Sequence, residues 1–275
     1  MLYIVATPIG NLEDITLRAI RILKEADEIA AEDTRHTKKL LKAYNIDTPM
    51  TSLYDAVEKK RSGPLIGKMV SGKDIAYVSD AGTPGISDPG FHLISEAIQA
   101  GIRVVPVPGA SAVVAALSAS GLPMQNFVFH GFLPAKIMQR RDILSRCEAE
   151  KRTMVFYESP QRLKACLKDI REIMGSRRLV VARELTKIHE EFIRGTIDDV
   201  VKELEERVVK GEITLIIAGR TDSAGDCSDD EILGRLTELA GDPLLSLRDR
   251  VRCVAEMTGC SRKKIYQIAL TGKFS

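Results

Sequence analysis

Glycine and proline residues are concentrated in a loop that could bind a ligand, at residues 79–90. The loop follows the short apolar run 75–78, which predicts a buried strand. Ligands of open α/β sheets usually bind at the carboxyl ends of such strands. Gly82, Gly85 and Gly90 permit close backbone approach, and two prolines stiffen the segment. We therefore interpret it as a shaped binding loop, with an ordinary strand-to-helix turn as the alternative.

Two further uncharged loops of this kind follow other predicted strands, at residues 8–10 and 108–112. The glycine pattern of dinucleotide-binding folds does not follow the first strand, and the sequence contains no phosphate-binding loop of the Gly-x-x-x-x-Gly-Lys type. Such loops offer backbone N–H and C=O groups and small side chains. They suit a nucleoside cofactor with a sulfonium centre, because it carries no phosphate that would demand lysines.

The predicted strands alternate with helical patterns along most of the chain. Four strand-then-helix units occupy the first 121 residues, and the rhythm continues to about residue 220, with a short antiparallel strand predicted at 190–195. One helix is predicted at 38–44, and another at 56–71 with an interruption near Gly63 and Pro64. Strands joined by helices indicate mostly parallel sheets. The sequence thus predicts an α/β fold, with α/β domains at 1–121 and 122–220 and a small helical tail at 226–275.

Basic residues are concentrated in the predicted tail. The formal net charge of the chain is +2, yet residues 244–275 contain seven basic and two acidic side chains. A helix, a glycine turn and a second helix that begins with Arg262, Lys263 and Lys264 resemble a helix-turn-helix. These three cations could meet phosphates, and a solvated helical cap is the alternative.

The remaining composition argues against several kinds of protein. The five cysteines are scattered without a CxxC pair, which indicates reduced thiols, and the four scattered histidines do not indicate a metal site. The longest nearly apolar stretch, 112–122, is too short to span a membrane, and the N-terminus shows no export signal. We expect a cytoplasmic protein without a metal and without membrane association.

Seven motifs follow one another along the chain: 7–12, 32–35, 79–90, 106–112, 131–134 with Lys136 and Arg140, 157–160, and 183–187 with Glu190 and Glu191. In this order they resemble the tetrapyrrole methylase superfamily, which comprises class III S-adenosylmethionine-dependent methyltransferases. Within it they look like the branch that methylates the ribose 2′-oxygen of a cytidine in small-subunit (16S) ribosomal RNA. The likeness extends from residue 2 to about residue 219.

The resemblance implies two α/β domains that hold S-adenosylmethionine in the cleft between them. It also implies a homodimer whose partner is the RNA of the small ribosomal subunit. Cofactor-binding residues are expected in both domains. The matching positions are Pro8, Gly10, Asp80, Ala81, Gly82, Ser111 and Ala112 in the first, and Phe132, Glu158, Arg183 and Thr214 in the second.

Methyl transfer to a ribose hydroxyl requires alignment of oxygen, methyl and sulfur, and a group that takes the proton or stabilises charge. Glu184 and Lys187, three residues apart just after a predicted strand, are the candidate catalytic residues. Glu184 would be the partner or base of the hydroxyl. Lys187 would stabilise the oxyanion, hold the adjacent phosphate, or act as the base if desolvation lowered its pKa. A structural ion pair is the alternative.

Other charged residues are candidate RNA contacts. Arg35, close to Glu32 at another strand end, can fork onto a phosphate, or these residues brace the neighbouring loop. Lys136, Arg140 and Arg141 share one face of a predicted helix and could track an RNA backbone, unless this is a plain solvated face. The predicted substrate-binding set is Glu32, Arg35, Lys136, Arg140, Arg262, Lys263 and Lys264.

Two other functions are compatible with these motifs. A small-molecule methyltransferase acting on tetrapyrroles or precorrin-type substrates would use the same cofactor, would not require the basic tail and would favour an aromatic-lined cleft. A non-catalytic RNA-binding assembly factor would not need the cofactor loops intact. The resemblance favours the S-adenosylmethionine-dependent rRNA (cytidine-2′-O)-methyltransferase over both.

Overall fold

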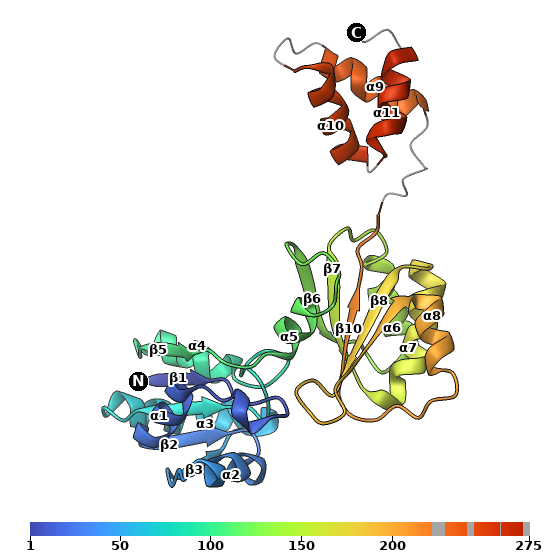
Figure 1. The fold of residues 1–275 in the computed structure, drawn as a ribbon. Helices are drawn as coiled ribbons and strands as arrows, with labels where there is room; N and C mark the ends of the chain where they lie inside the picture. The colour runs from blue at the N-terminus through green and yellow to red at the C-terminus, as the bar shows by residue number, and fades with distance from the viewer. Residues whose placement is uncertain (222–228, 241–244, 259, 272–275) are drawn as a thin grey trace. The chain divides into compact units, whose positions relative to one another are not determined.

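The computed structural model describes residues 1–221, 229–240, 245–258 and 260–271. The chain forms two compact units, Met1–Ala218 and Gly219–Ser275 (Figure 1). The first unit contains two five-stranded sheets with helices between the strands, and the second contains helices. No helix in the described part of the chain is long and apolar enough to cross a bilayer.

The first sheet is parallel throughout, as the sequence predicts, with strand order β3-β2-β4-β1-β5. Its strands are β1 (Leu2–Val5), β2 (Glu28–Ala31), β3 (Met50–Ser52), β4 (Ile75–Val78) and β5 (Val104–Val107). The short 3-10 helix η1 (Leu12–Asp14) and five α-helices accompany them: α1 (Leu17–Glu25), α2 (Thr34–Ala43), α3 (Asp55–Val70), α4 (Phe91–Gln99) and α5 (Ala112–Ser118).

Both faces of this sheet are buried. Along β1, Leu2 and Ile4 pack into one apolar cluster and Val5 into another, which is the alternation that a pleated strand imposes. α1 and α2 contribute to the cluster around Val5, and α3 and α4 to the opposite one. Because the sheet is covered on both sides, ligands can reach its strands only at their ends.

The second sheet has the order β6-β7-β10-β8-β9, and three of its four pairings are antiparallel. The α/β class is confirmed, but the expectation of a mostly parallel second sheet is wrong. Its elements are β6 (Phe127–Phe132), α6 (Ile137–Arg146), β7 (Thr153–Glu158), α7 (Pro160–Met174), β8 (Arg178–Arg183), β9 (Glu191–Thr196), α8 (Ile197–Leu204) and β10 (Ile213–Ile217).

One short connection explains the difference. β6, β7 and β8 run in the same direction, joined by helices, as the strand–helix rhythm predicts. The connection from β8 to β9 is too short for a crossover helix, so β9 turns back antiparallel to β8, which confirms the predicted antiparallel strand. β10 keeps the direction of β9 and inserts between β7 and β8, which makes both of its pairings antiparallel.

Two helices differ from their predicted extents. α3 runs without interruption through Pro64, because Leu65 and Met69 beyond the proline are buried in the core. α2 begins at Thr34 rather than at residue 38, because the Asp33 side chain caps it by accepting a hydrogen bond from the Arg35 N–H at 2.8 Å. Arg35 therefore lies in the first turn of a helix rather than in a loop.

The structure corrects the predicted role of Arg140. Its side chain is 4% exposed and forms an ion pair with Asp169 on α7, with an Nη2–Oδ2 distance of 2.6 Å. Arg141, which is 40% exposed, reaches both Asp169 and Glu172. A guanidinium inside this network cannot lie against an RNA backbone, so Arg140 joins α6 to α7 instead.

The second unit packs three helices around a small apolar cluster that includes Ile232, Val254 and Ile265. The helices are α9 (Asp229–Ala240), α10 (Leu247–Thr258) and α11 (Arg262–Thr271). α10 and α11 lie at the positions predicted for the two helices of the tail. Lys273, which was counted among the basic residues of the tail, lies outside the described residues.

Replacing Arg140 tests its structural role. Arg140→Ala leaves the buried Asp169 carboxylate with Arg141 alone, so we expect the free energy of unfolding to fall by about 3 kcal/mol in urea denaturation. Arg141→Ala, at an exposed position, is the control and should cost about 1 kcal/mol or less. A stable Arg140→Ala protein with weakened RNA association would instead favour the RNA contact.

Candidate active site

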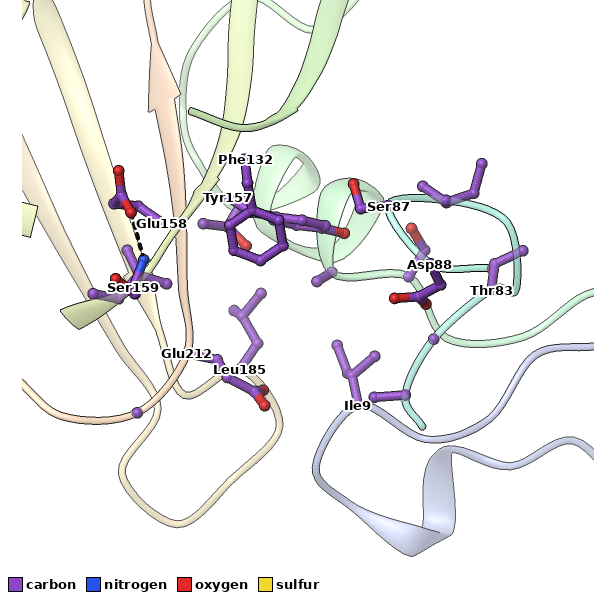
Figure 2. Close-up of a pocket in the computed structure, with 18 of the residues that line it drawn as sticks. Ile9, Thr83, Ser87, Asp88, Phe132, Tyr157, Glu158, Ser159, Leu185 and Glu212 are labelled. Carbon is purple, nitrogen blue, oxygen red and sulfur yellow. Dashed lines mark hydrogen bonds between the residues drawn. The ribbon is translucent and has the colours of Figure 1, made fainter. Parts of the chain in front are cut away.

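A cavity of about 380 Å³ lies where strand ends and loops of the two sheets meet (Figure 2). Its size is in the range of small-ligand sites, and most of its lining is apolar. One wall comes from the predicted binding loop, and the opposite wall comes from β7, β10 and neighbouring residues. Phe132 and Tyr157 pack against each other at one side of it, with their ring centroids 5.4 Å apart (Figure 2).

Seven of the predicted cofactor-binding residues line the cavity, and four do not. Those in the lining are Ala81, Gly82, Ser111, Ala112, Phe132, Glu158 and Thr214. Pro8 and Gly10 flank Ile9, which does line it. The Asp80 carboxylate accepts a hydrogen bond from the Asp33 N–H at 3.0 Å, and Arg183 donates to Glu191 and to the Lys210 carbonyl, both at 3.1 Å.

Gly10 allows the loop after β1 to touch the loop after β8. A Cβ atom there would lie 2.8 Å from Thr186 Oγ1 and 2.9 Å from the Leu185 carbonyl oxygen. The neighbouring Asn11 N–H donates to Thr186 Oγ1 at 3.0 Å. This contact joins the halves of the first unit beside the cavity, and only glycine leaves room for it.

Glu158, at the end of β7, contributes a buried acceptor to the lining. Its side chain is fully buried, and Oε1 accepts hydrogen bonds from the Ser159 N–H and from Arg162 Nε, both at 2.7 Å. Oε2 has no hydrogen-bond partner. The Cys166 thiol lies close to this carboxylate. Burial, and to a smaller extent the charge of Glu158, raise the pKa of the thiol. A thiol is only a weak hydrogen-bond donor. A buried carboxylate oxygen in this state is suited to a donor supplied by a ligand.

Asp88 lies in the lining of the opposite wall, and the sequence analysis did not single it out. Partial burial, and then the nearby Asp80 carboxylate, raise its pKa, while a hydrogen bond from Ser79 lowers it. Asp88 in turn helps to raise the pKa of Tyr157 to about 12, after the larger effect of burial. The sequence could have suggested Asp88, because loop 79–90 contains only two acidic residues. It does not tell which of the two points into the cavity.

The loop that carries Asp88 is held rigidly from behind. The Tyr77 hydroxyl donates to the Pro89 carbonyl at 2.7 Å. The buried Glu58 carboxylate accepts from the N–H groups of Gly90 and Leu93, both at 3.1 Å, and so caps α4. These contacts fix the residues directly after Asp88, and so they restrict the position of its side chain.

Strained backbone is concentrated around the cavity. Among the described residues, four other than glycine have a positive φ, and three of them are Ser87, Glu184 and Thr186. Such conformations persist where surrounding contacts enforce them, and they cluster at functional sites. The strain therefore supports the assignment of this cavity as the candidate active site.

Glu184 and Lys187 form an ion pair beside the cavity rather than in its lining. Lys187 Nζ lies 2.8 Å from Glu184 Oε1 and 3.1 Å from Glu212 Oε2, and Glu184 Oε1 also accepts from the Glu212 N–H at 3.0 Å. The hydrogen bond from Lys187 lowers the pKa of Glu184. Burial lowers the pKa of Lys187, but the bonds to both glutamates outweigh it, so its pKa is raised. These shifts oppose a role as base for either residue.

The predicted RNA contacts in the first unit lie outside the cavity lining. Arg35 pairs with Asp33 at 3.1 Å and is 90% exposed. Glu32 is partly buried, which raises its pKa, and it accepts a hydrogen bond from the Asp80 N–H at 3.3 Å. Lys136 is exposed at the start of α6. No cluster of potential metal ligands occurs among the residues that the structure describes.

The first unit consists of two α/β halves with a ligand-sized cavity at their strand ends. Comparisons with known proteins identify the family that has this architecture. Residues 1–201 match the family model described as Tetrapyrrole (Corrin/Porphyrin) Methylases, and the chain belongs to this family. It is similar to two proteins named Ribosomal RNA small subunit methyltransferase I. The one from Synechocystis sp. is 46% identical over 98% of this chain and 97% of its own length. The one from Halalkalibacterium halodurans is 53% identical over 79% of this chain and 75% of its own length.

Solved structures share the fold at low sequence identity. Uroporphyrin-III C-methyltransferase from Thermus thermophilus, complexed with S-adenyl homocysteine, matches with a TM-score of 0.56 and 17% identity over 78% of this chain and 96% of that one. A cobalt precorrin-4 methyltransferase of cobalamin biosynthesis matches with a TM-score of 0.59 and 18% identity over 79% and 94%. At these identities the likeness establishes the fold alone.

Gly10→Ala tests the contact between the two loops. The added methyl group must push the backbone of Leu185 away, so we expect a loss of about 1–3 kcal/mol in the free energy of unfolding. The control is Gly67→Ala in α3, where a Cβ meets nothing within 4 Å, and alanine should stabilise the helix by up to about 1 kcal/mol. Equal stability of both variants would show that the loops do not need this close approach.

Proposed function

We propose that this protein transfers the methyl group of S-adenosylmethionine to the ribose 2′-oxygen of a cytidine in the 16S RNA of the small ribosomal subunit. The names of its relatives, which align along nearly its whole length, support the class of substrate. The resemblance of its motifs to the 2′-O-methylating branch supports the ribose 2′-oxygen as the acceptor atom and cytidine as the nucleotide. The same resemblance supports a homodimer, and the scattered cysteines without a CxxC pair support a cytoplasmic location.

The charge of the cavity is the observation that carries the choice of cofactor. Asp88, Glu158 and Glu212 belong to the lining, and no lysine or arginine of the described residues does. Such a site favours a cationic ligand without phosphate. The unpartnered Glu158 Oε2 can accept a hydrogen bond from a hydroxyl or amino group of the nucleoside. When bound, S-adenosylmethionine supplies a methyl group activated by a positively charged sulfur.

Asp88 is the group we propose as the proton acceptor. Its carboxylate would take the proton of the substrate 2′-hydroxyl as that oxygen attacks. The bound cofactor would supply the methyl group to this oxygen and would keep the electron pair of the carbon–sulfur bond. The raised pKa of Asp88 makes it a stronger base than an ordinary aspartate, and its fixed loop keeps it in place.

Lys187 acts as a cation rather than as a base in this proposal. Its raised pKa keeps it charged, so it can stabilise the substrate oxygen as its proton leaves or hold the neighbouring phosphate. Glu184 and Glu212 orient the ammonium group. Glu184 is therefore a positioning residue.

Labelled S-adenosylmethionine tests the proposed function directly. Purified protein is incubated with assembled small subunits, naked 16S RNA or porphyrinogens, and methyl incorporation is measured. We expect label in ribosomal RNA at a ribose 2′-oxygen and none in porphyrinogens. Label in porphyrinogens alone would establish the tetrapyrrole function, and binding of RNA without transfer of label would favour a non-catalytic assembly factor.

Asp88→Asn tests the proton acceptor. The wild-type rate should rise with pH through the raised pKa of Asp88 and then level off, because only the deprotonated carboxylate can take a proton. The variant should lose this rise and lower kcat roughly 10²–10⁴-fold. It should also weaken cofactor binding, because it removes one negative charge from the lining. Asp47→Asn, at an exposed position outside the cavity lining, is the matched control. Loss of cofactor binding with an unchanged pH profile would make Asp88 a binding residue instead.

A further inference from the structure

The C-terminal unit contains a groove of about 690 Å³ between α10 and α11. We propose that this groove binds a single-stranded segment of RNA, with a base stacked on Tyr266 and phosphates against the surrounding cations. The inference rests on the proposed function for the identity of the RNA. The groove is lined by Ser246, Arg248, Asp249, Val251, Arg252, Arg262, Lys263, Tyr266 and Gln267.

Cationic side chains line the groove from both helices. Arg248 and Arg252 are four residues apart on one face of α10, and Arg262 and Lys263 lie at the start of α11. All four are exposed. Asp249 is the only acidic side chain among the described residues that line the groove, so they give it a strong positive excess.

Most of this charge is not neutralised by other described residues of the protein. Arg252 pairs with Asp249 at 3.0 Å. The side chains of Arg248, Arg262 and Lys263 have no hydrogen bond or ion pair with the described part of the chain. Cations of this kind bind phosphates with release of counterions, which makes affinity depend on salt.

Lys264 differs from its two neighbours, although the sequence groups all three. Its ammonium group lies 3.2 Å from Asp229 on α9, and it does not line the groove. The three consecutive cations predicted to meet phosphates are thus divided by the helical turn. Arg262 and Lys263 face the groove, and Lys264 helps to join α11 to α9.

The exposed ring of Tyr266 favours single-stranded over double-stranded RNA as the ligand of the groove. Ile265, Ile268 and Ala269 of α11 are buried in the core, while Tyr266 is 41% exposed in the groove, three and four residues beyond the two cations. It is the only aromatic residue among the described residues of this unit. Exposed aromatic rings beside cations are how proteins hold unpaired bases. A duplex would leave the ring unused, because its bases are stacked on one another and the major groove of RNA is too deep and narrow for side chains to read.

Fluorescence anisotropy with the full-length protein tests this surface. A labelled single-stranded RNA of about 12 nucleotides is compared with a duplex of the same sequence, without cofactor and over a series of salt concentrations. We expect tighter binding of the single strand. Tyr266→Ala should weaken it roughly 5–150-fold with an unchanged salt slope, and Tyr266→Phe should retain most of the affinity because stacking needs only the ring.

Charge variants separate this groove from a general effect of positive charge. Arg262→Gln with Lys263→Gln should weaken binding and reduce the salt slope by about 1.4, because each phosphate that a cation neutralises on a single strand adds about 0.7 to the slope. Lys264→Gln removes the same charge per residue from the same helix but outside the groove, and should change both quantities much less. Preference for the duplex, or equal effects of Lys263→Gln and Lys264→Gln, would overturn the proposal.

The two proposals fail in distinguishable ways. If the wild-type protein binds single strands through Tyr266 but transfers no methyl group to ribosomal RNA, the groove stands and the proposed function falls. If it methylates small subunits and Tyr266→Ala does so with an unchanged KM and unchanged RNA affinity, the proposed function stands and the groove falls.

Discussion

Carboxylates without cations in the cavity lining constrain which ligand this fold can hold. Asp88 and Glu158 are withdrawn from water on opposite walls, and a carboxylate in that state needs a donor or a positive charge. Arg162 and the Ser159 N–H meet this need for Oε1 of Glu158, but Oε2 has no partner. Ser79 donates a hydrogen bond to Asp88. The rest is left to the ligand. The uncharged glycine and proline loops fit this constraint, because they let backbone approach a ligand without adding cations of their own.

Keeping these groups in place has a conformational cost. Ser87, Glu184 and Thr186 have left-handed backbone, which for residues other than glycine costs about 1–3 kcal/mol each. Contacts made by distant parts of the chain offset it, such as the hydrogen bond from Tyr77 to the Pro89 carbonyl. The loops around the cavity are therefore not free to relax, which suits a reaction that depends on alignment.

The sequence predicts local features of this protein well and long-range ones less well. Apolar runs and glycine-rich turns indicated four of the five parallel strands of the first sheet, but not β3, and they indicated the short strand at Glu191–Thr196. They did not reveal that β10 inserts between β7 and β8, because no residue in β10 encodes its neighbours. The interruption predicted at Pro64 was wrong because tertiary burial of α3 outweighs the local penalty of proline.

The sequence by itself determined the α/β class, the loops that surround the cavity and the family, because each depends on residue types within a few positions of one another. Only the tertiary structure decided which charged side chains line the cavity. Asp80 is engaged by the backbone of Asp33, 47 residues away, while Asp88 faces the cavity. Arg140 is held by Asp169, 29 residues away, and Lys264 is turned from its neighbours toward α9. A side chain's direction follows from its partners, and those partners are brought to it only by folding.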